Sequence, residues 1–198
     1  MDSRPGDYFE FGVAHGNSLK AASIAAKKSR LRSIGVNALP RRIYGFDPFE
    51  GFKSSSELDQ HGIWTGTRFT HSFEKVSRRF KGDSSVSLHK VDATTLANEK
   101  GEIQANHEVF GISEGQKASI ILFDMDFFQP TFAALCFMKP LMQQGTFIMF
   151  DEISYFDGRR SKGEQYARDL FLSLNPNFNL AFVMTYGIGG IVYSVDVE

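Results

Sequence analysis

The sequence predicts an α/β fold in which helices cover a largely parallel sheet. Seven short apolar runs have the composition of strands that are buried on both faces. They alternate with segments of helical periodicity, which is the pattern of a parallel sheet covered by helices. Because 198 residues are enough for one domain with its own core, we expect a single domain over residues 1–198.

The predicted elements follow one another along the whole chain. Three helices are clearest: one that begins at Asn17 or Ser18, one that begins after Gln129, and one over residues 163–174. Pro130 suits the first position of the second helix. The strands are expected at residues 8–13, 43–46, 86–91, 119–123, 146–150, 181–185 and 190–195.

Composition argues against several classes of protein. The formal net charge of −1 at pH 7 offers no general attraction to the phosphates of nucleic acid. No apolar run approaches the ~20 residues that a membrane span requires. Cys136 is the single cysteine, so an internal disulfide cannot form, and we expect a cytoplasmic protein with no nucleic-acid or membrane partner.

The turn after the first predicted strand favours a cofactor without phosphates. Its sequence, GVAHGN, places Gly12 and Gly16 where the backbone can approach a ligand. It lacks the second and the last glycine of the G-x-G-x-x-G fingerprint, which a pyrophosphate needs for its close approach to the backbone. S-adenosylmethionine has no such requirement, so the turn indicates this cofactor over NAD.

Acidic residues lie in or directly after the first three predicted strands, whose carboxyl ends form the ligand-binding edge of such sheets. Glu10 lies inside the first run, either near the ammonium group of a cofactor or bonded only to local backbone. Asp47 follows the second run, where an acid accepts hydrogen bonds from ribose hydroxyls. Asp92 closes the third run, either beside an adenine or ribose or as a solvated strand-end residue.

Four more carboxylates follow the fourth and fifth predicted strands, and they come together if these strands are neighbours. The side chains are those of Asp124, Asp126, Asp151 and Glu152. Several carboxylates cannot all remain ionised side by side at low cost. They either share a hard cation such as magnesium or calcium, or retain a proton, or are neutralised by basic side chains, unless they only cap the following helices.

Several phrases of the sequence, in this order, resemble one protein family. They are YFEFGVAHGNSL, IYGFDPFEGF, VDATTL and ILFDMDFFQPTFAALCFMKPLMQQGTFIMFDEISY, and the likeness spans about residues 7 to 156. The family is that of the macrocin-type O-methyltransferases, a branch of the class I S-adenosylmethionine-dependent enzymes. The resemblance implies a Rossmann-like sheet of seven mostly parallel strands, with the last strand antiparallel and helices on both faces.

The same resemblance implies roles for individual residues. It places the methionine part of S-adenosylmethionine at the glycine turn, the ribose at Asp47 and the adenine near Asp92. The residues implied for the cofactor are Glu10, Gly12, Gly16, Ser18, Asp47, Asp92 and Asp124. Those implied for a magnesium ion are Asp124, Asp151 and Glu152, and Asp124 and Asp126 are implied for catalysis. Family members typically methylate a hydroxyl of a sugar on a natural product or a polysaccharide.

Three features of the chain depart from the family pattern. Phe127 and Phe128 replace a common Leu-Tyr pair, and Glu152 replaces a second aspartate. The chain begins close to its first strand, without the helices that help to cover the acceptor in related enzymes. Either the acceptor pocket is open, or a partner subunit in a homodimer completes it, or the chain is a piece of a longer protein.

Alternatives remain for both the mechanism and the class. His15 or His71 could replace an aspartate as the base that deprotonates the acceptor. An NAD-dependent oxidoreductase could use a similar fold, and a methyltransferase-like protein could bind ligands without catalysis. A nucleic-acid methyltransferase is less expected, because no Asp-Pro-Pro-Tyr-like segment follows the fourth strand.

Overall fold

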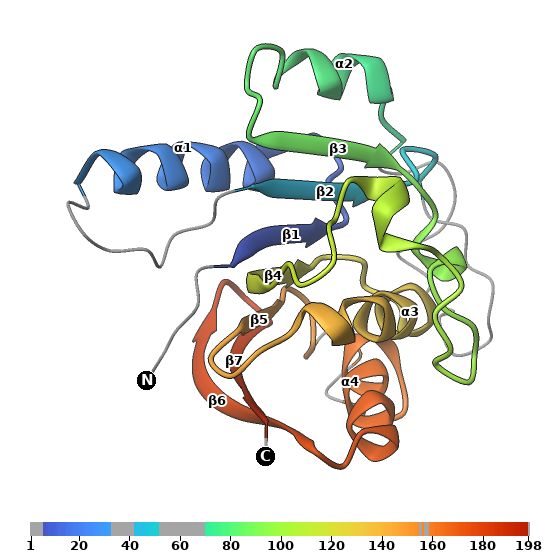
Figure 1. The fold of residues 1–198 in the computed structure, drawn as a ribbon. Coiled ribbons are helices and arrows are strands. Elements are labelled where there is room, and N and C mark those ends of the chain that lie inside the picture. Colours follow the sequence, from blue (N-terminus) through green and yellow to red (C-terminus); the bar gives the residue numbers. More distant parts are fainter. Residues whose placement is uncertain (1–5, 33–41, 52–69, 155, 157–158, 198) are drawn as a thin grey trace.

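A single sheet of seven strands organises the chain (Figure 1). The computed structural model describes residues 6–32, 42–51, 70–154, 156 and 159–197, without the side chains of residues 29–32. The strands are β1 (Asp7–Phe11), β2 (Ile43–Asp47), β3 (Val86–Lys90), β4 (Ala118–Phe123), β5 (Phe147–Phe150), β6 (Phe178–Tyr186) and β7 (Gly190–Val197). Their order across the sheet is β3-β2-β1-β4-β5-β7-β6.

The first five strands are parallel and the last is reversed. Strand β1 pairs in parallel with both β2 and β4, and β7 pairs antiparallel with both β5 and β6. The chain builds the sheet outward from β1 in both directions, so the strand order reverses between β1 and β4. In open α/β sheets such a switch point leaves a crevice at the carboxyl ends of the strands, where ligands bind. The predicted fold class, including the reversed last strand, is confirmed.

Helices cover both faces of the sheet (Figure 1). They are α1 (Asn17–Arg32), α2 (Phe73–Arg78), α3 (Phe128–Met138) and α4 (Gly163–Leu174), with short 3₁₀ helices η2 (Ala93–Thr95), η3 (His107–Phe110) and η4 (Lys139–Leu141). Side chains of α1 and α2 pack in one buried cluster, and side chains of α3 and α4 pack in another. The two clusters lie on opposite faces of the sheet.

The start of α3 differs from the prediction. The helix begins at Phe128, before Gln129, so that Pro130 is its third residue. Phe127 has extended backbone and ends the preceding segment. Amides of the first helical turn have no acceptor within the helix, and a proline therefore costs little at the third position as well as at the first.

A ladder of stacked phenylalanine rings runs across the centre of the sheet. Phe46, Phe11, Phe123 and Phe150 are neighbours in register on β2, β1, β4 and β5. Successive ring centroids are 4.7, 5.5 and 5.3 Å apart, and each side chain is at most 1% exposed. Offset aromatic pairs contribute beyond their buried area. The ladder therefore holds together the strands whose ends form the ligand edge.

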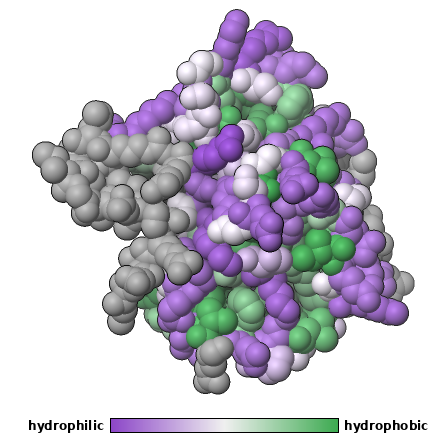
Figure 2. Space-filling view, in the orientation of Figure 1, coloured by the Kyte–Doolittle hydropathy of each residue, from purple (hydrophilic) through white to green (hydrophobic). Residues whose placement is uncertain are grey.

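Charged and polar residues cover most of the face in Figure 2, where apolar residues form small separate patches. Among the described residues, none of the helices has the length and apolar character needed to cross a bilayer.

We predict that Phe123→Ala lowers the free energy of unfolding by about 3–5 kcal/mol, because it empties the centre of this ladder. Denaturation with urea measures the change. Phe182→Ala, at a side chain that is 63% exposed, is the matched control and should stay within about 0.5 kcal/mol of the wild type. Similar losses for the two variants would contradict the role of the ladder.

Candidate functional site

The ends of β1 and β4 touch through their backbones at the first glycine turn. Gly12 donates its N–H to the carbonyl of Phe46 (2.9 Å), and Asp124 donates its N–H to the carbonyl of Phe11 (2.9 Å). The φ of Gly12 is +93°, and a Cβ there would lie 1.8 Å from the carbonyl oxygen of Asp124. Only glycine fits this position, which makes Gly12 a requirement of the fold, and its contact with a cofactor remains a prediction.

Asp47 joins the glycine turn to the loop after β2. Its Oδ2 accepts from the N–H of Ala14 (2.8 Å), and its Oδ1 accepts from the N–H of Phe49 (2.5 Å). Ala14 and Phe49 both have positive φ, a conformation that side chains rarely adopt. A carboxylate can accept about four hydrogen bonds. Asp47 therefore retains capacity for the ribose hydroxyls that the sequence predicts it to bind.

Glu10 lies beneath the glycine turn and is fully buried. Its oxygens accept from the hydroxyls of Tyr8 and Ser18, each at 2.7 Å. Burial raises the pKa of Glu10 to about 7, although these hydrogen bonds oppose the rise. The bonds tie β1 to the start of α1 through side-chain hydroxyls, whereas the structural alternative predicted bonds to local backbone. Contact of Glu10 or Ser18 with a cofactor remains a prediction.

Asp92 is the N-cap of η2. Its Oδ1 accepts from the backbone N–H (3.0 Å) and the hydroxyl (2.8 Å) of Thr94. These bonds fix the direction in which the chain leaves β3. They leave the other carboxylate oxygen of Asp92 available, and its contact with an adenine remains a prediction.

The acids after β4 and β5 are neighbours, as the sequence indicated. Phe123 pairs with Phe150, so Asp124 and Asp151 follow at the same level of the sheet, and Asp151 donates its N–H to the carbonyl of Phe123 (3.0 Å). Burial raises the pKa of Asp124 to about 7, and the charges of Asp151 and Glu152 add to this effect. Burial also raises the pKa of Glu152. Some of these carboxyls therefore hold a proton near neutral pH.

No basic side chain offsets these acids in the described part of the chain. The ion pairs found there involve Glu50, Asp83 and Asp169, and none involves an acid of the switch point. Within the same residues, no group of three or more His, Cys, Asp or Glu side chains is arranged to hold a metal ion. Glu152 Oε2 is buried and has no hydrogen-bond partner there. Magnesium ligation by Asp124, Asp151 and Glu152 remains a prediction.

Asp126 lies in a strained turn beside the start of α4. The φ of Asp126 is +64°, and its side chain is 5% exposed. The residues on either side of Asp126 are joined by a hydrogen bond, in which Phe127 donates its N–H to the carbonyl of Met125 (2.7 Å). A Cβ on Gly163 would lie 2.9 Å from the carbonyl of Asp126. Strained backbone of this kind is common at functional sites.

Glu164 and Tyr186 belong to this edge of the sheet, and both were missed by the sequence analysis. Glu164 is 1% exposed, and it accepts from the backbone N–H groups of Met125 (3.5 Å) and Glu152 (3.2 Å). Burial raises its pKa well above the usual range. Burial and the charge of Asp151 raise the pKa of Tyr186. An acid in the first turn of a helix normally indicates only a favourable interaction with the helix dipole. The sequence therefore offered no reason to place Glu164 beside the ends of β4 and β5.

The two candidate histidine bases contact each other at the glycine turn. The rings of His15 and His71 lie 3.7 Å apart, centroid to centroid. Burial lowers the pKa of His71, and the neighbouring His15 lowers it further. Both effects favour the neutral form of His71.

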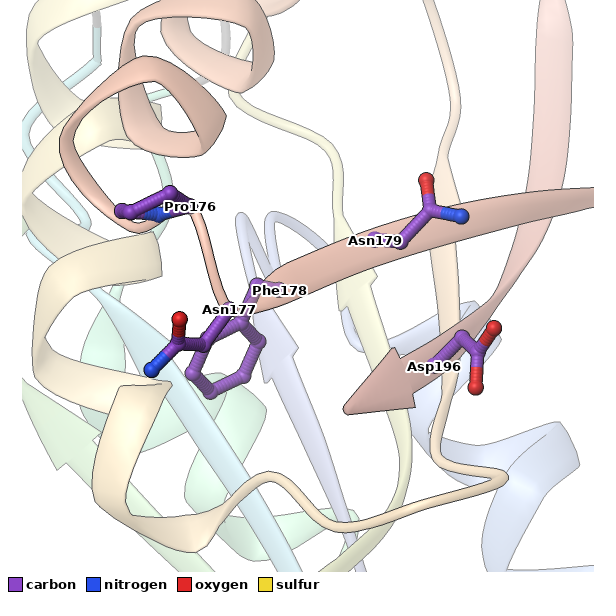
Figure 3. Close-up of a pocket in the computed structure, with 5 residues that line it drawn as sticks. All are labelled: Pro176, Asn177, Phe178, Asn179 and Asp196. Carbon is purple, nitrogen blue, oxygen red and sulfur yellow. The ribbon is translucent and has the colours of Figure 1, made fainter. Parts of the chain in front are cut away.

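A separate hollow of about 290 Å³ lies where β6 begins and β7 ends (Figure 3). Its lining residues are Pro176, Asn177, Phe178, Asn179 and Asp196. Asn179 pairs with Asp196 at the beginning of β6 and the end of β7. Because β7 is antiparallel to β5, this hollow lies at the amino edge of the sheet, opposite the switch point.

We predict that Glu10→Gln flattens the dependence of stability on pH. In the wild type the pKa of Glu10 is about 7, against an ordinary 4.5, so stability declines as pH rises from 4.5 through about 7. Over that interval, the free energy of unfolding of the glutamine variant should rise by about 3 kcal/mol relative to that of the wild type. Urea denaturation at several pH values measures it, with the exposed Glu99→Gln as control. If the pH profile of the glutamine variant is the same as that of the wild type, the ionisation of Glu10 does not cause the decline of stability with rising pH.

Comparison with known proteins identifies the fold. No family model matches the sequence, and neither does any curated protein sequence. CalS11, a calicheamicin methyltransferase described in another structure as a TDP-rhamnose 3′-O-methyltransferase, matches with a TM-score of 0.68 and 22% identity over 96% of this chain and 72% of its own. The O-methyltransferase NovP matches with a TM-score of 0.63 and 17% identity, and the match covers 96% of this chain and 72% of NovP. An O-methyltransferase from Bacillus cereus, in complex with S-adenosylhomocysteine, matches with a TM-score of 0.51 and 16% identity. This match covers 97% of this chain and 74% of the Bacillus cereus protein. The chain has the fold of the S-adenosylmethionine-dependent methyltransferases, as its sequence resemblance implied.

Proposed function

We propose that the chain is an S-adenosylmethionine-dependent O-methyltransferase that acts on a hydroxyl of a small molecule. The observation that carries the proposal is the group of acidic side chains at the switch point, which form no ion pair with a described lysine or arginine and whose buried members would ionise more readily beside a cation. S-adenosylmethionine presents a sulfonium and an ammonium group, which carboxylates attract. NAD presents a pyrophosphate, which the same carboxylates repel.

The cofactor would lie over the ends of β1, β2 and β3. We assign the methionine part to the turn between Gly12 and Gly16, the ribose to Asp47 and the adenine to the neighbourhood of Asp92. Asp47 supports this assignment, because its bond to Ala14 fixes the turn relative to the ribose site (2.8 Å). Glu10 and Ser18 hold the turn from below.

The reaction would take place near Asp124. When bound, S-adenosylmethionine supplies a methyl group that an acceptor oxygen displaces from sulfur. Asp124 or Asp126 would take the proton from that hydroxyl. The pKa of about 7 suits Asp124 to this role, because a general base works best near the operating pH. Holding the two reactants in line supplies much of the rate in such transfers.

A sugar is the acceptor class that we favour, on a natural product or a polysaccharide. The support is the family resemblance and the description of CalS11 as a methyltransferase of TDP-rhamnose. We also propose that nucleic acid is not the substrate, because the formal net charge of −1 offers no general attraction to its phosphates. A homodimer that completes the acceptor pocket remains part of the proposal.

Magnesium is proposed only as an accessory to this reaction. Asp124, Asp151 and Glu152 supply the oxygen ligands that a hard cation prefers, and the orphaned Glu152 Oε2 could serve as one. These side chains do not converge on one point in the described structure. We therefore assign no step of the reaction to a metal.

Calorimetric titration tests the cofactor. We predict that S-adenosylhomocysteine binds and NAD does not, and that added magnesium is not required. Asp47→Ala should weaken binding by about a hundredfold, since hydrogen bonds to a charged carboxylate are lost. Asp196→Ala, at the exposed acid of the opposite edge, should bind like the wild type.

The opposite results separate the alternatives. Binding of NAD alone would favour an oxidoreductase. Binding of neither ligand would favour a methyltransferase-like protein that does not use this cofactor. Tight binding of S-adenosylhomocysteine without methyl transfer to any sugar would retain the cofactor and overturn the acceptor class.

A further inference from the structure

Helix α2 is docked on the glycine turn. Gly16 has a φ of +75°, and a Cβ there would lie 3.1 Å from Val76 and 3.2 Å from Phe80. Arg79 donates from its guanidinium to the carbonyl of His15 and to Asn17 Oδ1, the latter at 2.9 Å. These contacts place α2 beside the turn to which we assign the cofactor.

The first residue of α2 touches the loop after β2. Phe73, the first residue of α2, packs edge to face against Phe49 with ring centroids 5.3 Å apart. Phe49 is held in turn by the bond from its N–H to Asp47 (2.5 Å). The residues just before α2 therefore lie between the two loops that meet at Asp47.

His71 occupies this position and has an unused polar atom. Its Nε2 is buried and has no hydrogen-bond partner among the described residues. One side of its ring faces His15, with centroids 3.7 Å apart. The charge of Asp47 acts on His71 and opposes the lowering of its pKa. A neutral imidazole offers one N–H donor and one acceptor nitrogen, and either can pair with a hydroxyl.

We propose that His71 binds a ribose hydroxyl of the cofactor, opposite Asp47. This proposal rests on the proposed function, because it needs an adenosine ligand at the glycine turn. It gives the orphaned Nε2 a partner, and it gives α2 a role as the support of one wall of the site. The contact of His71 with His15 fixes the ring, and the docking of α2 fixes the backbone that carries it.

Two variants separate the ring of His71 from its hydrogen bond. His71→Phe keeps an aromatic ring against His15 and removes the polar atom. His71→Gln loses the ring and places an amide near the position of Nε2. We expect the phenylalanine variant to bind S-adenosylhomocysteine about tenfold more weakly than the wild type, and the glutamine variant to recover part of the loss.

An analogue of S-adenosylhomocysteine without the two ribose hydroxyls identifies the partner. The wild type and His71→Phe should bind this analogue equally well, because the hydrogen bond is absent from both complexes. His89→Phe is the matched control: its Nε2 is also buried and unpartnered within the described chain, but its ring lies in the aromatic cluster of Phe46 and Phe110. This control should bind S-adenosylhomocysteine like the wild type.

Three results would overturn the proposal. Unchanged binding of S-adenosylhomocysteine by His71→Phe would show that Nε2 has no part in it. Equal losses for S-adenosylhomocysteine and the analogue would assign His71 a structural role only. If the wild type binds neither compound, the proposed function fails together with this inference, whereas the first two results leave the proposed function standing.

Discussion

The site depends on one backbone contact, between Gly12 and the end of β4. A side chain at Gly12 would place its Cβ 1.8 Å from the carbonyl of Asp124, so the two strand ends can meet only without it. Hydrogen bonds from Gly12 to Phe46 and from Asp124 to Phe11 continue the sheet beyond its regular pairs. This contact places the glycine turn directly beside the acidic end of β4. The candidate residues of the site lie on the strand ends and loops around it.

Charge is the second constraint, because the fold concentrates acids where it has few means to compensate them. Glu10 is stabilised by two hydroxyl donors, and Glu164 by two backbone amides, yet burial raises the pKa of both. A buried carboxylate is costly unless it is paired. A cationic ligand would relieve this cost on binding. The arrangement that limits stability is thus the one on which we base the proposal of S-adenosylmethionine over NAD.

Much of this architecture could be predicted from local patterns. Apolar runs located the strands, and the acids that follow them, such as Asp47 and Asp124, predicted which edge of the sheet binds a ligand. The bond between Asp47 and Ala14 joins residues 33 positions apart, and no local pattern indicates it. Glu164 and Tyr186 were missed for the same reason: their meaning comes from long-range packing of α4 and of the β6–β7 hairpin against the ends of β4 and β5. The early start of α3 shows that proline is tolerated at the third position of this helix as well as at the first position that its sequence suggested.

A crystal structure of the protein with S-adenosylhomocysteine tests the central claim most directly, that the acidic switch point binds the cofactor. We predict the homocysteine part at the turn from Gly12 to Gly16 and the ribose between Asp47 and His71. The sulfur should face Asp124. Density for the ligand at the amino edge of the sheet, in the hollow between Pro176 and Asp196, would contradict the account, as would an adenosine placed away from Asp47.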